Sequence, residues 1–164
     1  MKKSTNLNQS YIYDTNIQHT DFHEKKIKIF LVDDDTVFLK LLQHEFLQTE
    51  EYIVETYPTG EACLAHLEHN PDLIILDYHL DGIEVGAING LETLDKIKTF
   101  NPKIPVVMLS SQDKIDVAVN CIHHQASDYV VKSETAFLRL QKTIKSILNY
   151  RKMALQLDWY MDRM

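Results

Sequence analysis

The chain has 164 residues, of which 45% are hydrophobic, so it is long enough to bury one core of ordinary size and we expect a single domain. Its 17 Lys and Arg residues against 24 Asp and Glu residues give a net charge of -7, which argues against a direct nucleic-acid partner, since phosphate backbones are bound by basic surfaces. No apolar stretch reaches membrane-spanning length, and Cys63 and Cys121 lack the spacing of a disulfide framework, so we expect a cytoplasmic protein with no membrane insertion.

From Ile27 onward, the chain alternates short apolar runs with segments of helical period. Residues 1–24 are polar without a sustained period, and we expect an N-terminal extension that does not carry the fold. We predict strands at 27–32, 52–57, 72–76, 104–109 and 127–131, and helices at 36–48, 59–69, 91–99, 113–124 and from 134 onward. This strict alternation favours an α/β fold with a parallel sheet covered on both faces, because parallel strands need crossover connections.

Hydroxyl side chains stand where three of the helices are expected to begin. We predict that Thr59, Ser111 and Ser133 cap the second, fourth and fifth helices by accepting hydrogen bonds from free backbone N–H groups.

The last helix has an apolar stripe, made of Phe137, Leu140, Ile144, Ile147 and Leu148. Beyond Tyr150 the stripe weakens, and residues 151–164 are predicted to continue the helix or to form a linker stub. We expect the end of this helix to mediate homodimerisation or partner docking.

Polar residues directly follow four of the predicted strands. Asp33 and Asp34 follow the first strand, Asp77 the third, Ser110 the fourth and Lys132 the fifth. Ligands bind at the carboxyl ends of the strands in open parallel sheets, and carboxylates with an ammonium group suit a divalent cation and phosphoryl transfer. Taken singly, each residue is better explained as a turn former, a helix cap or a surface charge. Their placement at corresponding strand ends of one alternating pattern is what favours a shared site.

The segments LVDDD, PDLIILD, VVMLSS and ASDYVVK resemble the motif blocks of the bacterial two-component receiver family, and together they span about residues 27–148. The resemblance implies a doubly wound, flavodoxin-like domain with five helices and strand order 2-1-3-4-5, which we place at residues 25–150. It also implies that a sensor histidine kinase or a histidine phosphotransfer protein donates a phosphoryl group to the domain. Catalysis would be limited to the domain's own phosphorylation and dephosphorylation, with output by conformational change.

The resemblance assigns a role to each matching residue. Asp77 would be the phosphoacceptor, and Asp33 and Asp34 would hold Mg²⁺ together with it. Ser110 would be the switch hydroxyl and Tyr129 the switch aromatic residue. By the same resemblance, Lys132 would neutralise a phosphoryl oxygen.

The sequence departs from the family pattern in two loops. Asp81 stands where a proline is usual, and the glycine-bearing loop at 81–90 is longer than usual, which is explained by a tolerated insertion or by a role in partner selection. Ser133 follows Lys132 where proline is common. We also hypothesise that His79, two residues after Asp77, tunes the lifetime of the phosphoryl group.

Two other functions compete with a phosphorylatable receiver. A haloacid dehalogenase-type hydrolase also uses an aspartate after the first strand, but DDDT at 33–36 is one residue too short for that motif and no acidic pair follows Lys132. A receiver-like scaffold that only binds partners is the second alternative. Metal binding by Cys63, His66 and His69, or by Cys121 with the two histidines at 123 and 124, is only weakly indicated because neither set has a four-ligand spacing.

Overall fold

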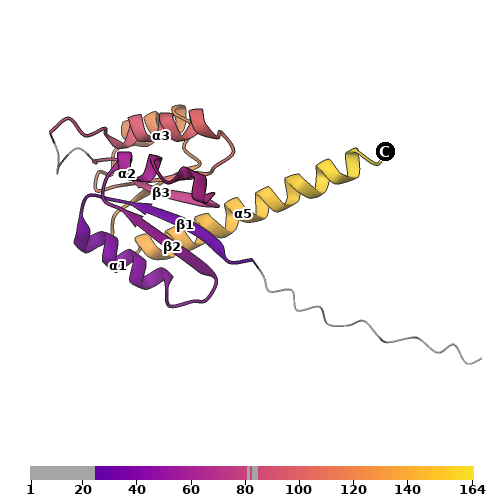
Figure 1. Ribbon diagram of the computed structural model, residues 1–164, viewed down its shortest axis with the longest axis horizontal. Helices are drawn as coiled ribbons and strands as arrows, with labels where there is room; N and C mark the ends of the chain where they lie inside the picture. Colours follow the sequence, from indigo (N-terminus) through magenta and orange to yellow (C-terminus); the bar gives the residue numbers. More distant parts are fainter. Residues whose placement is uncertain (1–24, 81, 83–84) are drawn as a thin grey trace, which may run out of the picture.

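The computed structural model describes residues 25–164 apart from residues 81, 83 and 84, so the predicted extension at 1–24 lies outside the described residues. Five parallel strands form one sheet in the order β2-β1-β3-β4-β5 (Figure 1). The strands are β1 (Ile27–Val32), β2 (Tyr52–Tyr57), β3 (Leu73–Asp77), β4 (Val106–Ser110) and β5 (Asp128–Val131). The predicted α/β class, strand order and parallel pairing are confirmed.

Helices cover both faces of this sheet (Figure 1). They are α1 (Thr36–Phe46), α2 (Gly60–Leu64), α3 (Gly90–Phe100), α4 (Ile115–His123) and α5 (Ala136–Met161), with a short 3-10 helix, η1 (Leu67–His69), after α2. The buried side chains of α1 and α5 pack on one face, and those of α2, α3 and α4 pack on the other. The sheet is therefore doubly wound, as the sequence predicts.

The central strands are buried on both faces because their successive side chains point to opposite sides. In β1, Ile29 and Leu31 pack with α1 and α5, whereas Phe30 and Val32 pack with the helices of the opposite face. Cys63 and Cys121 are free thiols buried in this second core cluster, in agreement with their lack of disulfide spacing.

One of the three predicted helix caps is correct. Thr59 Oγ1 accepts a hydrogen bond from the backbone N–H of Ala62 at 3.1 Å. The caps predicted at Ser111 and Ser133 are wrong, because α4 and α5 begin several residues later and neither has a side-chain cap. Before α4, the backbone N–H of Gln112 donates to Ser110 Oγ and its carbonyl accepts the hydroxyl of Tyr129. Because both groups already have partners, this segment does not join the helix.

Before α5, the Ser133 side chain faces Thr135 Oγ1 at 3.2 Å, and only its backbone carbonyl bonds to the helix, through the N–H of Ala136. The predicted helix at 59–69 is also interrupted. His66 donates its backbone N–H to Cys63, three residues earlier, while its ring nitrogen lies 2.8 Å from the carbonyl of Ala62. This tighter pattern ends α2 and leads into η1.

The last helix has 26 residues and leaves the domain at its C-terminal end, the yellow end in Figure 1. Leu140 and Ile144 are buried against the sheet, whereas every residue from Asn149 onward is exposed. The predicted continuation of the helix past Tyr150 is thereby confirmed, and the assignment of 151–164 as a linker stays a prediction. Among the described residues, no helix is both long and apolar enough to cross a membrane.

Candidate functional site

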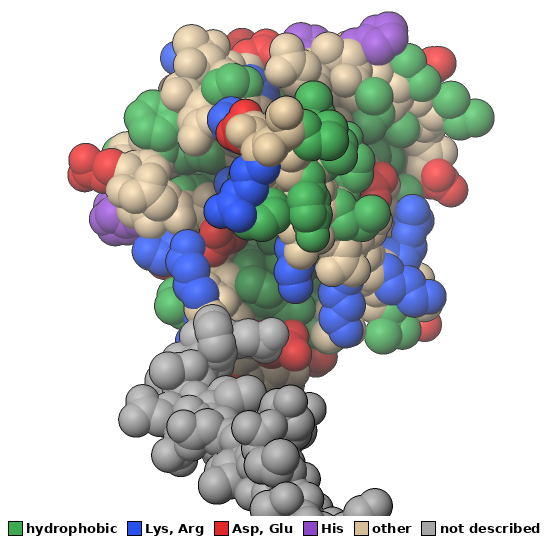
Figure 2. Space-filling model, turned by 90° about the vertical axis from the view of Figure 1, so that its right-hand side faces the viewer, with side chains coloured by type: hydrophobic (Ala, Val, Ile, Leu, Met, Phe, Trp, Pro, Cys, Tyr) green, Lys and Arg blue, Asp and Glu red, His purple; other side chains and the backbone are tan. Residues whose placement is uncertain are grey.

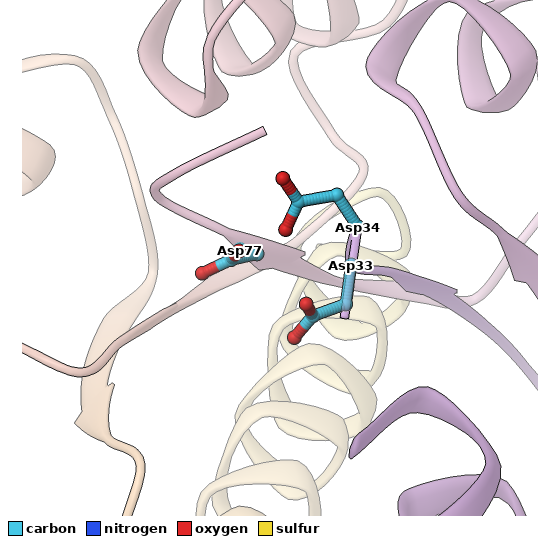
Figure 3. A group of neighbouring side chains, drawn as sticks. All are labelled: Asp33, Asp34 and Asp77. Atoms are coloured by element: carbon cyan, nitrogen blue, oxygen red, sulfur yellow. The ribbon is translucent and has the colours of Figure 1, made fainter. Parts of the chain in front are cut away.

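The ends of β1 and β3 bring three carboxylates together. Val32 pairs with Leu76 in adjacent parallel strands, so the residues that follow them, Asp33 and Asp77, lie side by side. Asp34 completes the group, and one oxygen of each residue lies within 4.8 Å of the others. Figure 3 shows the three carboxylates around a shared space at the strand ends.

Lys132 reaches this group from the end of β5. Its Nζ lies 2.7 Å from Asp33 Oδ2 and 3.3 Å from Asp77 Oδ1. The backbone N–H of Lys132 donates to the carbonyl of Ser110 at 2.8 Å, which fixes the start of the side chain. The ammonium group also lies 4.7 Å from the centre of the Phe38 ring, a favourable cation–π distance. The serine that replaces the usual proline at position 133 therefore does not move Lys132 away from the carboxylates.

Burial and mutual repulsion make this site electrostatically unusual. Burial, and then the charge of Asp33, raise the pKa of Asp77 to about 7, although Lys132 opposes the shift. Burial likewise raises the pKa of Asp33. Burial alone lowers the pKa of Lys132, but its hydrogen bond to Asp33 and the charges of both carboxylates outweigh that effect and raise it. Three carboxylates and one ammonium group thus lie together in a largely buried space.

The three consecutive aspartates after β1 have different partners. Asp35 Oδ1 caps α1 by accepting the backbone N–H groups of Val37 and Phe38 at 3.0 and 3.1 Å. Asp33 Oδ1 accepts the N–H of Asp35 at 2.9 Å, which orients its other oxygen toward Lys132. Asp35 is therefore a helix cap, whereas Asp33 and Asp34 face the shared space.

The two predicted switch residues, Ser110 and Tyr129, both bind Gln112 in the segment after β4. Ser110, at the end of β4, is buried, and its Oγ accepts the backbone N–H of Gln112 at 3.0 Å. Tyr129, in β5, is half-buried and donates its hydroxyl to the carbonyl of the same Gln112. Sequence reasoning missed Gln112, because its part depends on backbone groups that no residue type reveals.

The chemistry of the donor set fits a hard divalent cation. Carboxylate oxygens are the ligands that Mg²⁺ and Ca²⁺ prefer, and the only group of three potential ligand residues found in the described part of the chain is Asp33, Asp34 and Asp77. The alternative set of Cys63, His66 and His69 does not form a group of metal ligands in the described part of the chain. Cys63 is buried, and the ring of His69 is bound to Glu55 instead.

Comparison with known proteins decides between the possible families. The family model described as the response regulator receiver domain matches residues 29–145. The chain belongs to this family. Its membership in the receiver family favours a signalling domain over a dehalogenase-type hydrolase.

The receiver domain is similar to the transcriptional regulatory protein ZraR of Klebsiella oxytoca, with 31% identity over 131 residues. The match covers 79% of this chain but only 28% of ZraR, so the chain spans less than a third of that relative. Among solved structures, NtrX from Brucella abortus matches with a TM-score of 0.65 and 29% identity, covering 77% of this chain and 29% of NtrX. A CheY-like response regulator receiver domain protein from Methanospirillum hungatei matches with a TM-score of 0.63 and 25% identity, covering 78% of this chain and 98% of that one.

Proposed function

We propose that this receiver domain is a phosphorylatable switch of a two-component phosphorelay, in which Asp77 accepts a phosphoryl group from a sensor histidine kinase or a histidine phosphotransfer protein. The observation that supports this most directly is the Asp77 carboxylate itself, which is buried beside Asp33 and within 3.3 Å of the Lys132 ammonium group. A buried carboxylate with a neighbouring cation suits a nucleophile for phosphorus.

In the proposed reaction, one carboxylate oxygen of Asp77 attacks the phosphorus of a phosphohistidine. The new P–O bond forms as the P–N bond breaks, and the electron pair of the broken bond stays on the imidazole nitrogen, which then takes a proton from water. Lys132 neutralises part of the charge on the phosphoryl oxygens. Asp33, Asp34 and Asp77 would hold Mg²⁺, which supplies the remaining positive charge when bound.

The proposed output is conformational. Ser110 would leave its bond to the Gln112 N–H and donate its hydroxyl to a phosphoryl oxygen. Tyr129 would then shift together with Ser110, changing the surface beside β5 and α4. We propose no catalysis beyond phosphorylation and dephosphorylation of the domain itself.

An apolar groove beside the site supports a protein phosphodonor. It lies between α1 and the start of α5, and its lining includes Phe38, Leu41 and Leu138. Leu41 and Leu138 are more than half exposed, and Phe38 contacts Lys132. We propose that the groove binds the helix carrying the donor histidine. Leu41→Asp should then slow phosphoryl transfer from the cognate kinase while leaving phosphorylation by acetyl phosphate unchanged. A wild-type rate of transfer from the kinase, or an equal loss with both donors, would contradict this.

The exposed end of α5 supports homodimerisation. Four of its exposed apolar side chains repeat at alternating spacings of three and four residues, which is the seam of a coiled coil: Tyr150, Met153, Leu157 and Tyr160. This seam lies on a different side of the helix from Leu140 and Ile144, which pack on the sheet. Figure 2 shows hydrophobic side chains gathered over this end of the helix.

We propose that a second copy of the chain covers this seam, because a projecting helix gains its stability by packing an apolar face. The four seam positions, 150, 153, 157 and 160, all carry large uncharged side chains that two copies can bury against each other. Leu157→Asp should lower the molar mass measured by light scattering to that of a monomer. Leu155→Asp, an equally exposed leucine outside the seam, is the matched control and should leave the dimer intact. A wild-type monomer at high concentration would refute the dimer.

The experiment that tests the proposed function is an intact-mass measurement after incubation with acetyl phosphate and Mg²⁺. Wild-type protein should gain one phosphoryl group in a Mg²⁺-dependent manner, and Asp77→Asn should not. Asp35→Asn is the control, because asparagine is an equally good helix cap and the Asp35 side chain is bound to the first turn of α1. If the wild type gains no mass from acetyl phosphate or from the cognate kinase, the chain is a scaffold that only binds partners.

A further inference from the structure

The Phe38 ring is the third partner of the Lys132 ammonium group. The Nζ atom lies 2.7 Å from Asp33 Oδ2 and 3.3 Å from Asp77 Oδ1, and it lies 4.7 Å from the centre of the ring. In the part of the chain that the structure describes, these three side chains are the partners found for this charge. Two of them attract the ammonium group as anions, whereas the ring attracts it through the electron-rich face of its π system.

Phe38 is fixed beside the site by the turn that carries the aspartates. Its backbone N–H donates to the capping oxygen of Asp35 at 3.1 Å, and the N–H of Asp35 donates to Asp33 Oδ1 at 2.9 Å. The side chain of Phe38 is half-buried and packs against the core cluster under α1 and α5. The place of the ring therefore does not depend on the ion pairs of Lys132.

The two carboxylates that bind Lys132 are also proposed ligands of Mg²⁺. When Asp33 and Asp77 share their charge with a divalent cation, their attraction for the ammonium group falls, and the two cations repel each other. The ring is not part of the carboxylate cluster, so its attraction for the ammonium group remains. A Lys132 side chain that left the carboxylates would turn toward the open groove, which is lined by Phe38 and Ser133.

We propose that Phe38 is a positioning residue: its ring keeps the Lys132 ammonium group beside Asp77 when Mg²⁺ is bound. This rests on the proposed function, in which Lys132 neutralises a phosphoryl oxygen. Without the ring, the flexible stem of Lys132 is free to carry the ammonium group into the groove. Loss of one largely buried cation–π contact should lower the ratio of bound to released ammonium group about fivefold.

The first test asks whether the contact survives metal binding, and it measures no phosphorylation. In wild-type protein, the Cε protons of Lys132 should show a nuclear Overhauser effect to the ring protons of Phe38. The effect should be present without Mg²⁺ and at saturating Mg²⁺. Its loss on addition of Mg²⁺ would overturn the inference.

The second test measures how often Lys132 leaves the site. Its rate of acetylation by acetic anhydride is followed by the mass of the peptide that contains it. At saturating Mg²⁺, Phe38→Leu should be acetylated at Lys132 about fivefold faster than wild type. Without Mg²⁺ the two rates should be similar, because the carboxylates then hold the ammonium group.

Two further variants separate the ring from general packing. Phe38→Tyr keeps the aromatic face and should be acetylated at the wild-type rate. Phe137→Leu is the matched control, since Phe137 lines the same groove but its ring packs against Phe46, with the centroids 5.1 Å apart. Equal rates in Phe38→Leu and Phe137→Leu at saturating Mg²⁺ would overturn the inference.

The third test is the rate of phosphorylation by acetyl phosphate, a donor that does not use the groove. Phe38→Leu should be phosphorylated about fivefold more slowly than wild type, and Phe38→Tyr and Phe137→Leu at the wild-type rate. A wild-type rate in Phe38→Leu would overturn the inference. If wild-type protein gains no phosphoryl group while the first two tests give the expected results, the proposed function alone fails, and Phe38 still positions Lys132.

Discussion

The Nζ atom of Lys132 lies 2.7 Å from Oδ2 of Asp33, and this ion pair sets the charge balance of the site. In the described part of the chain, Lys132 is the one ammonium or guanidinium group that forms an ion pair with this carboxylate cluster. Two negative charges therefore remain without a counterion when all three carboxylates are ionised. The site is thus arranged to bind further positive charge, and removing a carboxylate should relieve repulsion.

The first prediction concerns the stability of Asp77→Asn without divalent cations. The pKa of Asp77 is raised to about 7 in the folded protein from an ordinary value of 3.8, so the folded state holds this proton more tightly than the unfolded state. The carboxyl group therefore contributes stability at low pH that is lost as the pH rises toward 7. We expect Asp77→Asn to be more stable than wild type by about 1 to 3 kcal/mol at pH 8, and the advantage to shrink at pH 4.5. Urea unfolding at both pH values measures this, and an advantage independent of pH would contradict it.

The second prediction concerns Mg²⁺ binding. Saturating Mg²⁺ should stabilise wild-type protein against unfolding by about 2 to 3 kcal/mol at a hundredfold excess over its dissociation constant. Asp34→Asn removes one of the three carboxylates, so the stabilisation should largely disappear. Asp35→Asn, one residue away, keeps the cap of α1 and should respond as wild type does. Equal responses of the two variants would exclude Asp34 from the site.

The third prediction concerns His79 and the lifetime of the phosphoryl group. A ring nitrogen of His79, two residues after Asp77, can accept a proton from the water that attacks the phosphoryl group. We expect His79→Ala to slow dephosphorylation several-fold, measured by the decay of the phosphorylated mass after the donor is removed. His123→Ala, an exposed histidine at the end of α4, should decay at the wild-type rate. A decay rate in His79→Ala equal to that of wild type rules out this role.

The fourth prediction concerns Gly90, the first residue of α3. A Cβ atom at this position would lie 2.3 Å from the carbonyl oxygen of Asp77 and 2.7 Å from Cα of Tyr78, both of them backbone atoms that cannot move aside. Gly90→Ala should therefore destabilise the fold by about 3 kcal/mol and displace Asp77. Gly86→Ala is the control, since only its positive φ opposes a side chain there and the loss should be about 1 kcal/mol. If both variants lose equal stability, the contact of Gly90 with the backbone of Asp77 and Tyr78 is not the reason that the fold needs glycine there.

The sheet and most of the site could be predicted from the sequence, because both follow from where apolar runs end. Strands buried on both faces leave uninterrupted runs such as 73–76, and the polar residue after each run necessarily lies at the carboxyl edge. The convergence of Asp33, Asp77 and Lys132 needs only that rule and the strand order. Each predicted strand agrees with the structure within two residues at either end.

The wrong helix-cap predictions arose where backbone groups are bound by side chains outside the helix. Ser111 is a good helix cap by type, but the peptide groups of its neighbour Gln112 are bound by Ser110 and Tyr129, so α4 begins only at Ile115. The sequence also could not tell which of the consecutive aspartates caps α1 and which joins the carboxylate site. Asp34 and Asp35 are the same residue type, and only the backbone conformation after β1 gives them different roles.

The length of α5 gives the molecule a mechanical property. The helix begins four residues after Lys132, is held on the sheet as far as Leu148, and runs about 20 Å further to Met161 at 1.5 Å per residue. A tilt of about 10° at its base therefore displaces its free end by about 3 Å. α5 therefore carries a rotation of the domain surface beside the site to a free end that lies well outside the domain.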